Sequence, residues 1–211
     1  MCVTKEVSLI AFLVCISMCI YLYRRNNTND RWIAYLFIYL GTMQLIEFFI
    51  WTDQACSGLN QRATTIGFWH NILQPIVSLA VAYYITNGNI PIYVYLVVGL
   101  YIVTSLPRIW EAKKPNQCSL PCSKGSLGLS WNYTNTKNST YVWAIFCIAL
   151  AVPLLCMKKD GETYAGLIIA TYILSYFVSK SRCPMGIIPS TGSWWCLMAV
   201  LIPALAIMIN K

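Results

Sequence analysis

The feature that most constrains this chain is a series of seven mostly apolar runs, about 17 to 24 residues long except for a slightly shorter one at 91–106. A helix of about 20 apolar residues crosses the roughly 30 Å hydrocarbon core of a bilayer. Only helices and closed β-barrels satisfy every backbone hydrogen bond inside lipid, and the runs lack the alternating pattern of a barrel. The sequence therefore predicts an all-α fold, a polytopic transmembrane bundle of seven helices that forms one domain over 1–211. The predicted helices are 7–23, 31–51, 64–86, 91–106, 141–157, 163–179 and 193–210.

The composition also favours a membrane location. Only 10% of the residues are charged and 58% are hydrophobic, whereas soluble domains carry roughly a quarter charged residues. The net charge is +8, but the cations lie between the apolar runs, where Lys and Arg anchor helix ends near lipid headgroups. We therefore expect the lipid bilayer as a partner and no nucleic acid. The expected membrane is a plasma membrane, an endomembrane or a viral envelope, and the sequence gives no oligomeric state.

Two features of the loops disagree about orientation. With seven crossings, the N-terminus and the loops 52–63, 107–140 and 180–192 lie on one side. Cysteines and glycosylation sequons gather on that side, as expected for the lumen or exterior. By contrast, nine of the 15 Lys and Arg residues also fall there, although the opposite, shorter loops have the higher density of positive charge. We give the cysteines more weight, so the sequence favours an N-terminus outside and a C-terminus inside.

The long loop 107–140 is therefore expected to be extracellular or luminal. The candidate glycosylation sites are Asn132 and Asn138, and the candidate disulfide cysteines are Cys56, Cys118, Cys122 and Cys183. Cys118 pairs with Cys122, or one of these two pairs with Cys56 or Cys183. Four cysteines allow three connectivities, and the sequence does not choose among them.

Ionisable residues inside a membrane helix are costly to bury and usually functional. The second predicted helix contains one such carboxylate, Glu47, and the third contains the only histidine of the chain, His70. Gln44 shares a helix face with Glu47, and Gln74 shares one with His70, with Asn71 beside it. At 1.5 Å per residue, Glu47 and His70 each lie about 7 Å below the outer ends of their predicted helices. We therefore predict one polar cluster, formed by these five side chains, in the outer half of the membrane.

This predicted cluster has two interpretations. A buried carboxylate and a histidine can exchange protons near neutral pH, which indicates a site for protons, ions or a polar ligand. Polar side chains also join membrane helices by hydrogen bonds worth about 1 kcal/mol each, which would make the cluster structural. Pro75 follows Gln74, and a proline within a helix frees a backbone carbonyl that could line a cavity.

Several chemistries are disfavoured by missing motifs. A single histidine cannot build a multi-His zinc site, and the sequence has no phosphate loop and no G-x-S-x-G elbow. The last predicted helix has no lysine before Lys211 that could hold retinal as a Schiff base. We expect no metal, no cofactor and no catalytic residue.

The segments Met43-Gln-Leu-Ile-Glu-Phe-Phe-Ile-Trp51 and Trp69-His-Asn-Ile-Leu-Gln-Pro75 resemble a group of uncharacterised small membrane proteins of large DNA viruses and unicellular eukaryotes. The resemblance covers the second and third predicted helices only. It implies a setting, which includes a viral one, and no activity.

Three functional classes remain open. The favoured class is a transporter or channel for protons, ions or a small polar solute, with Glu47 and His70 as its titratable pair. The second is a receptor-like or envelope interaction protein that displays the cysteine-clamped loop. The third, an intramembrane enzyme, is least favoured because no nucleophile, base and metal can all be named.

Overall fold

A computed structural model describes residues 4–111, 118–121, 129–131, 139–182 and 187–209. The helices are α1 (Lys5–Arg25), α2 (Thr28–Thr52), α3 (Leu59–Thr86), α4 (Ile92–Glu111), α5 (Ser139–Ala151), the 3₁₀ helix η1 (Val152–Cys156), α6 (Gly161–Arg182), α7 (Ile187–Ala199) and α8 (Leu201–Ile209). Two short antiparallel strands, β1 (Leu120–Pro121) and β2 (Leu129–Ser130), form a hairpin in which Leu120 pairs with Ser130. The predicted all-α fold is confirmed, apart from this hairpin.

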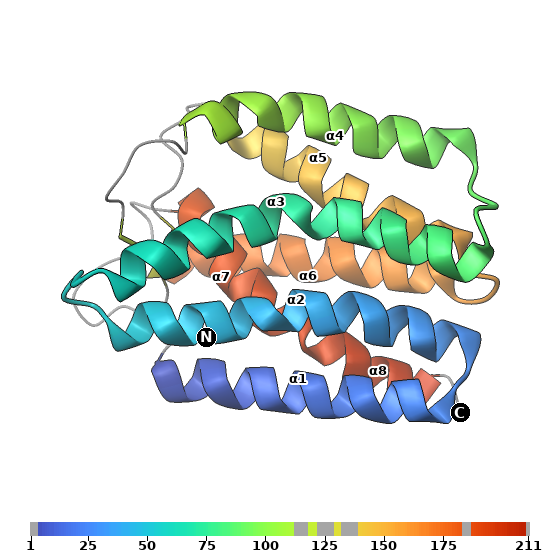
Figure 1. The fold of residues 1–211 in the computed structure, drawn as a ribbon, viewed down its shortest axis with the longest axis horizontal. Helices are drawn as coiled ribbons and strands as arrows, with labels where there is room; N and C mark the ends of the chain where they lie inside the picture. Colours follow the sequence, from blue (N-terminus) through green and yellow to red (C-terminus); the bar gives the residue numbers. More distant parts are fainter. Residues whose placement is uncertain (1–3, 112–117, 122–128, 132–138, 183–186, 210–211) are drawn as a thin grey trace.

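The helices run along the long axis of the molecule (Figure 1). The α1–α2, α3–α4 and α5–α6 connections lie at one end, which we call the short-loop end. The α2–α3 connection and the hairpin lie at the other, which we call the hairpin end. α1 packs most extensively on α2, α2 packs on α3, and α7 packs on α6, α2 and β2. Seven crossing helices require consecutive loops to alternate between the two ends, and the described loops do so. The side of the membrane that each end faces stays a prediction.

Each predicted apolar run corresponds to helical structure, but fewer helices than seven pass a test of length and composition. Within the described residues, four segments are long and apolar enough to cross a membrane: Lys5–Arg25, Thr28–Thr52, Ile92–Trp110 and Thr191–Ile209. Tyr141–Cys156 is apolar but shorter. The chain thus has four candidate membrane-spanning helices, which support a membrane location.

Prolines explain where two of the predicted runs are interrupted. Pro153 cannot donate a hydrogen bond to the turn before it, and α5 tightens there into η1. Pro203 lies three residues after Val200, the residue at which α7 and α8 separate. Helix α4 instead continues through Pro107, five residues beyond its predicted end at 106. The Arg108 guanidinium lies 4.9 Å from the centre of the Trp143 ring of α5, which holds this last part of α4 against the bundle.

An arginine at the short-loop end joins three elements. Arg25, the last residue of α1, forms a two-pronged ion pair with the completely buried Asp30 of α2, with one N–O distance of 2.7 Å. Its guanidinium also donates to the backbone oxygens of Ala206 and Ile207 in α8, both at 3.2 Å. These carbonyls belong to the last turn of α8, where no helical N–H follows to bond them. Arg25 therefore ties the end of α8 to the α1–α2 turn.

Replacing Arg25 by Met is expected to destabilise the protein by about 3 kcal/mol, because it leaves the Asp30 carboxylate buried without its arginine. Denaturation in detergent, followed by circular dichroism, measures the change. Arg24→Met is the matched control, since Arg24 is exposed and forms no ion pair with a described residue. Equal effects of the two substitutions would contradict this role for Arg25.

Candidate functional site

His70 is the centre of a compact hydrogen-bonded contact between α2 and α3. Its Nε2 lies 2.9 Å from the backbone oxygen of Tyr39 and 2.6 Å from the Thr42 hydroxyl. The imidazole stacks on the Tyr39 ring, with centroids 4.1 Å apart and planes 8° apart. The Tyr39 hydroxyl in turn donates to the backbone oxygen of His70 at 3.1 Å. We call this group of three residues the His70 knot.

The hydrogen bonds of the His70 knot fit a neutral imidazole, in which one ring nitrogen donates and the other accepts. A backbone oxygen only accepts, so Nε2 carries the hydrogen that Tyr39 receives. The Gln74 side-chain amide lies 3.4 Å from the other nitrogen, Nδ1, and can donate to it. The Thr42 hydroxyl donates to the same Tyr39 oxygen at 2.6 Å, which leaves it able to accept from Nε2. Nε2 therefore joins α3 to α2, as in the structural interpretation of the polar cluster, while the contact of Nδ1 with Gln74 lies within α3.

The structure corrects the predicted depth of His70. Helix α3 begins at Leu59 and not near residue 64, so His70 lies eleven residues, or about 17 Å, inside it. Glu47 lies only about 8 Å from the end of α2 at Thr52. The residue of α2 that is level with His70 is Thr42, one to two turns deeper than Glu47. The predicted pairing of Glu47 with His70 at one level is therefore wrong in register.

Glu47 and Gln44 are both completely buried on the same face of α2. The two remaining residues of the predicted cluster, Asn71 and Gln74 of α3, are also buried. Further along α3, Ser78 donates to the backbone oxygen of Leu150 in α5 at 2.9 Å. The polar residues of α3 therefore contact two different helices: His70 contacts α2, and Ser78 contacts α5.

Buried polar side chains from several helices gather in the half of the bundle next to the hairpin. Besides Glu47, these are Ser8, Gln44, Asp53, Asn60, Thr64, Asn71, Ser105, Arg108, Ser119, Ser175, Ser179, Thr191 and Ser193. Helix α7 packs against α2, which places its buried hydroxyls in the same half as Glu47. Because ionisable side chains are costly to bury in an apolar helix and are usually functional, Glu47 is a candidate functional residue.

Pro75 lies beside this polar region and alters the backbone of α3. Its missing N–H cannot bond the carbonyl of Asn71, one turn earlier. Two neighbouring carbonyls accept hydroxyl groups from adjacent helices: His70 accepts from Tyr39, and Ile72 accepts from Tyr101 of α4 at 3.1 Å. Hydroxyls of α2 and α4 therefore bond the carbonyls on either side of Asn71.

The hairpin end is closed by contacts that join the α2–α3 connection to the segment before β1. A disulfide links Cys56 to Cys118, with Cα atoms 6.2 Å apart. Asn60 donates to the Ser119 backbone oxygen and accepts from its N–H, both at 2.9 Å. Thr64 also donates to the Ser119 hydroxyl at 3.0 Å. We call these four contacts the latch, and they confirm one of the pairings that the sequence left open.

Trp131 lies just beyond β2 and is buried against α3. A Cβ atom at Gly67 would lie 2.6 Å from its ring, so only glycine allows this close approach. The remaining loop candidates, Cys122, Cys183, Asn132 and Asn138, lie outside the described residues.

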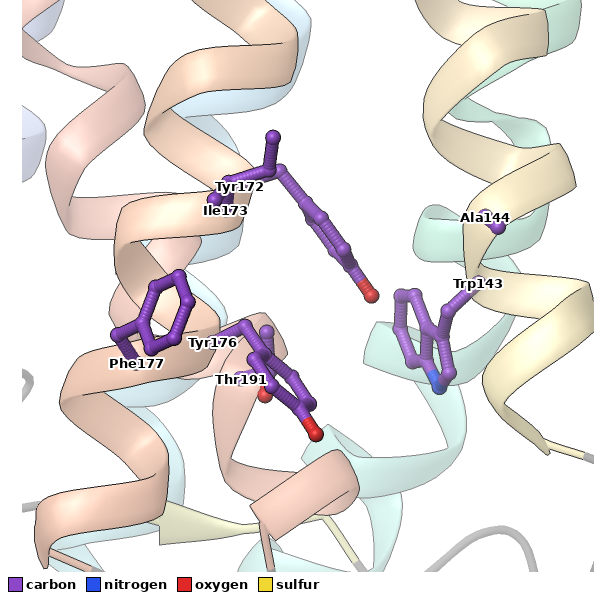
Figure 2. A pocket seen from close by; sticks show the side chains of 7 residues that line it. All are labelled: Trp143, Ala144, Tyr172, Ile173, Tyr176, Phe177 and Thr191. Carbon is purple, nitrogen blue, oxygen red and sulfur yellow. The ribbon is translucent and has the colours of Figure 1, made fainter.

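Two cavities open on the outward side of the helices in the same half of the bundle. One, of about 280 Å³, is lined mainly by aromatic residues of α5 and α6. Figure 2 shows Tyr172 and Tyr176 reaching from α6 toward Trp143 of α5. The other, of about 490 Å³, lies between α2 and α3 and ends at His70. Neither of these two is lined by Glu47.

Among the described residues, no group of three or more His, Cys, Asp or Glu side chains could hold a metal ion. No protein-family model, curated protein or solved structure matches the chain. The resemblance of residues 43–51 and 69–75 to small viral and unicellular membrane proteins therefore stays a prediction.

Sequence reasoning missed Asp53, which organises the α2–α3 connection. Its carboxylate accepts from the N–H groups of Ser57 and Asn60, at 2.9 and 3.0 Å, and from the Ser57 hydroxyl at 2.9 Å. No local signal marked it, because Asp53 lies eleven residues before the expected helix start at 64, whereas a capping residue directly precedes its helix. These hydrogen bonds, chiefly from the Asn60 N–H and then from Ser57, lower the pKa of Asp53 to about 2 from its usual 3.8.

The lowered pKa predicts loss of stability in acid. The stabilising contribution of Asp53 is complete above pH 3.8, its usual pKa, and disappears as the pH falls toward about 2. The thermal unfolding temperature in detergent is expected to fall more steeply over this window in the wild type than in Asp53→Asn. Parallel curves for the two proteins would contradict the assignment.

The His70 knot predicts energetic coupling between Thr42 and His70. In a double-mutant cycle of Thr42→Val and His70→Ala, we expect a coupling of about 1 kcal/mol, because each substitution removes the same hydrogen bond. Denaturation in detergent measures it. Thr86→Val, at the short-loop end, should be additive with His70→Ala. Additivity of the Thr42 pair as well would show that the contact contributes nothing.

Proposed function

We propose that the chain is an integral membrane protein in which seven helical rods all cross the bilayer, with the hairpin end outside. The rods are α1, α2, α3, α4, α5 with η1, α6, and α7 with α8. Four of the rods meet the requirements of length and composition by themselves. The outward faces of α3 and α6 support the same placement. Ile66 and Tyr84 of α3 and Ile173 and Phe177 of α6 are all exposed, and such faces are stable next to acyl chains.

This topology predicts which loops a membrane-impermeant maleimide can reach from outside sealed cells. In a variant whose cysteines outside the Cys56–Cys118 pair are replaced by alanine, Ser57→Cys should be labelled from outside. Gly88→Cys and Asp160→Cys, in the short loops, should react only after the membrane is opened. Labelling of the short-loop positions in sealed cells would contradict the proposed orientation.

For a membrane protein with this topology, we propose that protons, a small cation or a small polar solute are transported through the half of the bundle next to the hairpin, where the buried polar side chains lie. The observation that carries the proposal is the complete burial of Glu47 within α2, a helix apolar enough to cross a membrane. An ionisable side chain within a membrane-crossing helix is costly to bury and usually marks a path for ions or protons. Gln44, one turn deeper on the same face, offers amide groups to the same solute.

The geometry supports different roles for the two residues first expected to act as a pair. Glu47 is the candidate carrier of charge. His70 is held by Tyr39, Thr42 and Gln74, so we assign it the positioning of α2 against α3. A transport cycle with these roles uses the Glu47 carboxylate alone and requires no proton exchange between Glu47 and His70.

Glu47→Gln is expected to lower proton or cation flux in reconstituted liposomes at least about tenfold, because the amide can neither ionise nor balance a cation. Glu162→Gln, an exposed carboxylate at the start of α6, is the matched control and should leave flux unchanged. Flux that is the same in wild type and Glu47→Gln would overturn the assignment of Glu47.

The latch favours a second candidate, a receptor-like or envelope interaction protein that presents the hairpin. A disulfide and three hydrogen bonds hold Cys118 and Ser119 against the ends of α2 and α3, which is a rigid base for a binding surface. Absence of flux under every ion gradient, in liposomes that contain folded protein, would favour this candidate over transport.

A further inference from the structure

The groove between α2 and α3 combines an apolar wall with a charged mouth. Its volume is about 490 Å³, and Leu45 and Phe49 of α2 face Ile66 of α3 across it. Arg62 lines it one turn into α3, and Thr42 and His70 line its deeper part. From Arg62 to His70 the groove follows eight residues of α3, or about 12 Å.

The groove opens outward, on the surface that the proposed topology places against lipid. Phe49, Leu59 and Ile66 are between 39% and 59% exposed, so a chain lying along the groove would cover apolar surface that the bundle itself leaves open. An occupant that fills such a wall is itself apolar along its length.

The positive charge of Arg62 indicates which chemical group an occupant of the groove has at its outer end. The Arg62 side chain is exposed and forms no ion pair with any described residue. The Asp53 carboxylate accepts three hydrogen bonds within its own loop, and Glu47 is completely buried and does not line the groove. An arginine of this kind matches a phosphate group, to which its planar guanidinium can donate two hydrogen bonds.

We propose that this groove is a binding site for one glycerophospholipid. The phosphate pairs with Arg62, and one acyl chain lies between Leu45, Phe49 and Ile66 with its end toward the His70 knot. A bound chain would thus contact the side chains that set the register of α2 and α3. The proposal rests on the membrane placement proposed above, and it does not depend on transport.

Photo-crosslinking tests the site. The delipidated full-length protein is reconstituted with a trace of phosphatidylcholine that carries a diazirine in its acyl chain, and the labelled residues are mapped by mass spectrometry. Label is expected to concentrate in 42–49 and 59–70. Arg62→Gln should reduce this label at least threefold, and Ile66→Trp, which narrows the groove, should reduce it similarly. Diacylglycerol with the same acyl chains, which lacks the phosphate, should label the groove more weakly.

Both substitutions are at exposed positions, and a thermal unfolding scan of each variant confirms that it is folded. Arg24→Gln, an exposed arginine at the short-loop end, is the control and should leave the groove label unchanged. Label spread evenly over the outward faces of α3, α4 and α6, and unchanged by Arg62→Gln, would overturn the proposal in favour of ordinary surrounding lipid. Failure of the chain to enter vesicles at all would instead overturn the membrane placement.

Discussion

The apolar outer surface of the bundle is the constraint on which the rest of this structure depends, and in our proposal it contacts lipid. Large hydrophobic side chains point outward from α1, α3, α4 and α6, among them Ile10, Ile92, Val103 and Phe177. Polar side chains such as Gln44, Asn60 and Ser193 are buried instead. In lipid, every polar group in the bundle needs a partner inside the protein or a functional reason to be there. The gathering of polar groups next to the hairpin is therefore the region where function is expected.

Two sets of contacts fix the helices that surround this region. At the short-loop end, Arg25 joins α1 and α2 to the end of α8. At the hairpin end, the latch joins the α2–α3 connection to the segment before β1. The His70 knot lies between them and sets the register of α2 and α3. Glu47 consequently lies between the levels of the knot and the latch, and we assign the proposed transport role to Glu47 and not to a Glu47–His70 pair.

The apolar runs were sufficient to predict the helices and the sorting of their loops between two ends, because both follow from local sequence. The register of α3 was not predictable in this way. Asn60 and Arg62 are polar, so an apolar window starts the helix near residue 64, whereas Asp53 binds the N–H of Asn60 and the helix begins at Leu59. That difference of about five residues moved His70 from the level of Glu47 to the level of Thr42. The pairing of Asn60 with Ser119 joins residues 59 positions apart, and no local pattern indicates such a contact.

Among the seven rods, α6 gives the most direct test of the claim that all of them cross the bilayer, because it is not among the four apolar candidates. Nitroxide labels placed one at a time at Ile169, Ile173 and Phe177, on its exposed face, report collisions with oxygen and with a water-soluble nickel chelate in liposomes. The labels are attached to cysteines in a variant whose free cysteines are replaced by alanine. A membrane-crossing α6 predicts high collision rates with oxygen and low rates with the chelate at all three positions, lowest at the most deeply placed label. High collision rates with the chelate along this face would show that α6 lies in water and would contradict the account.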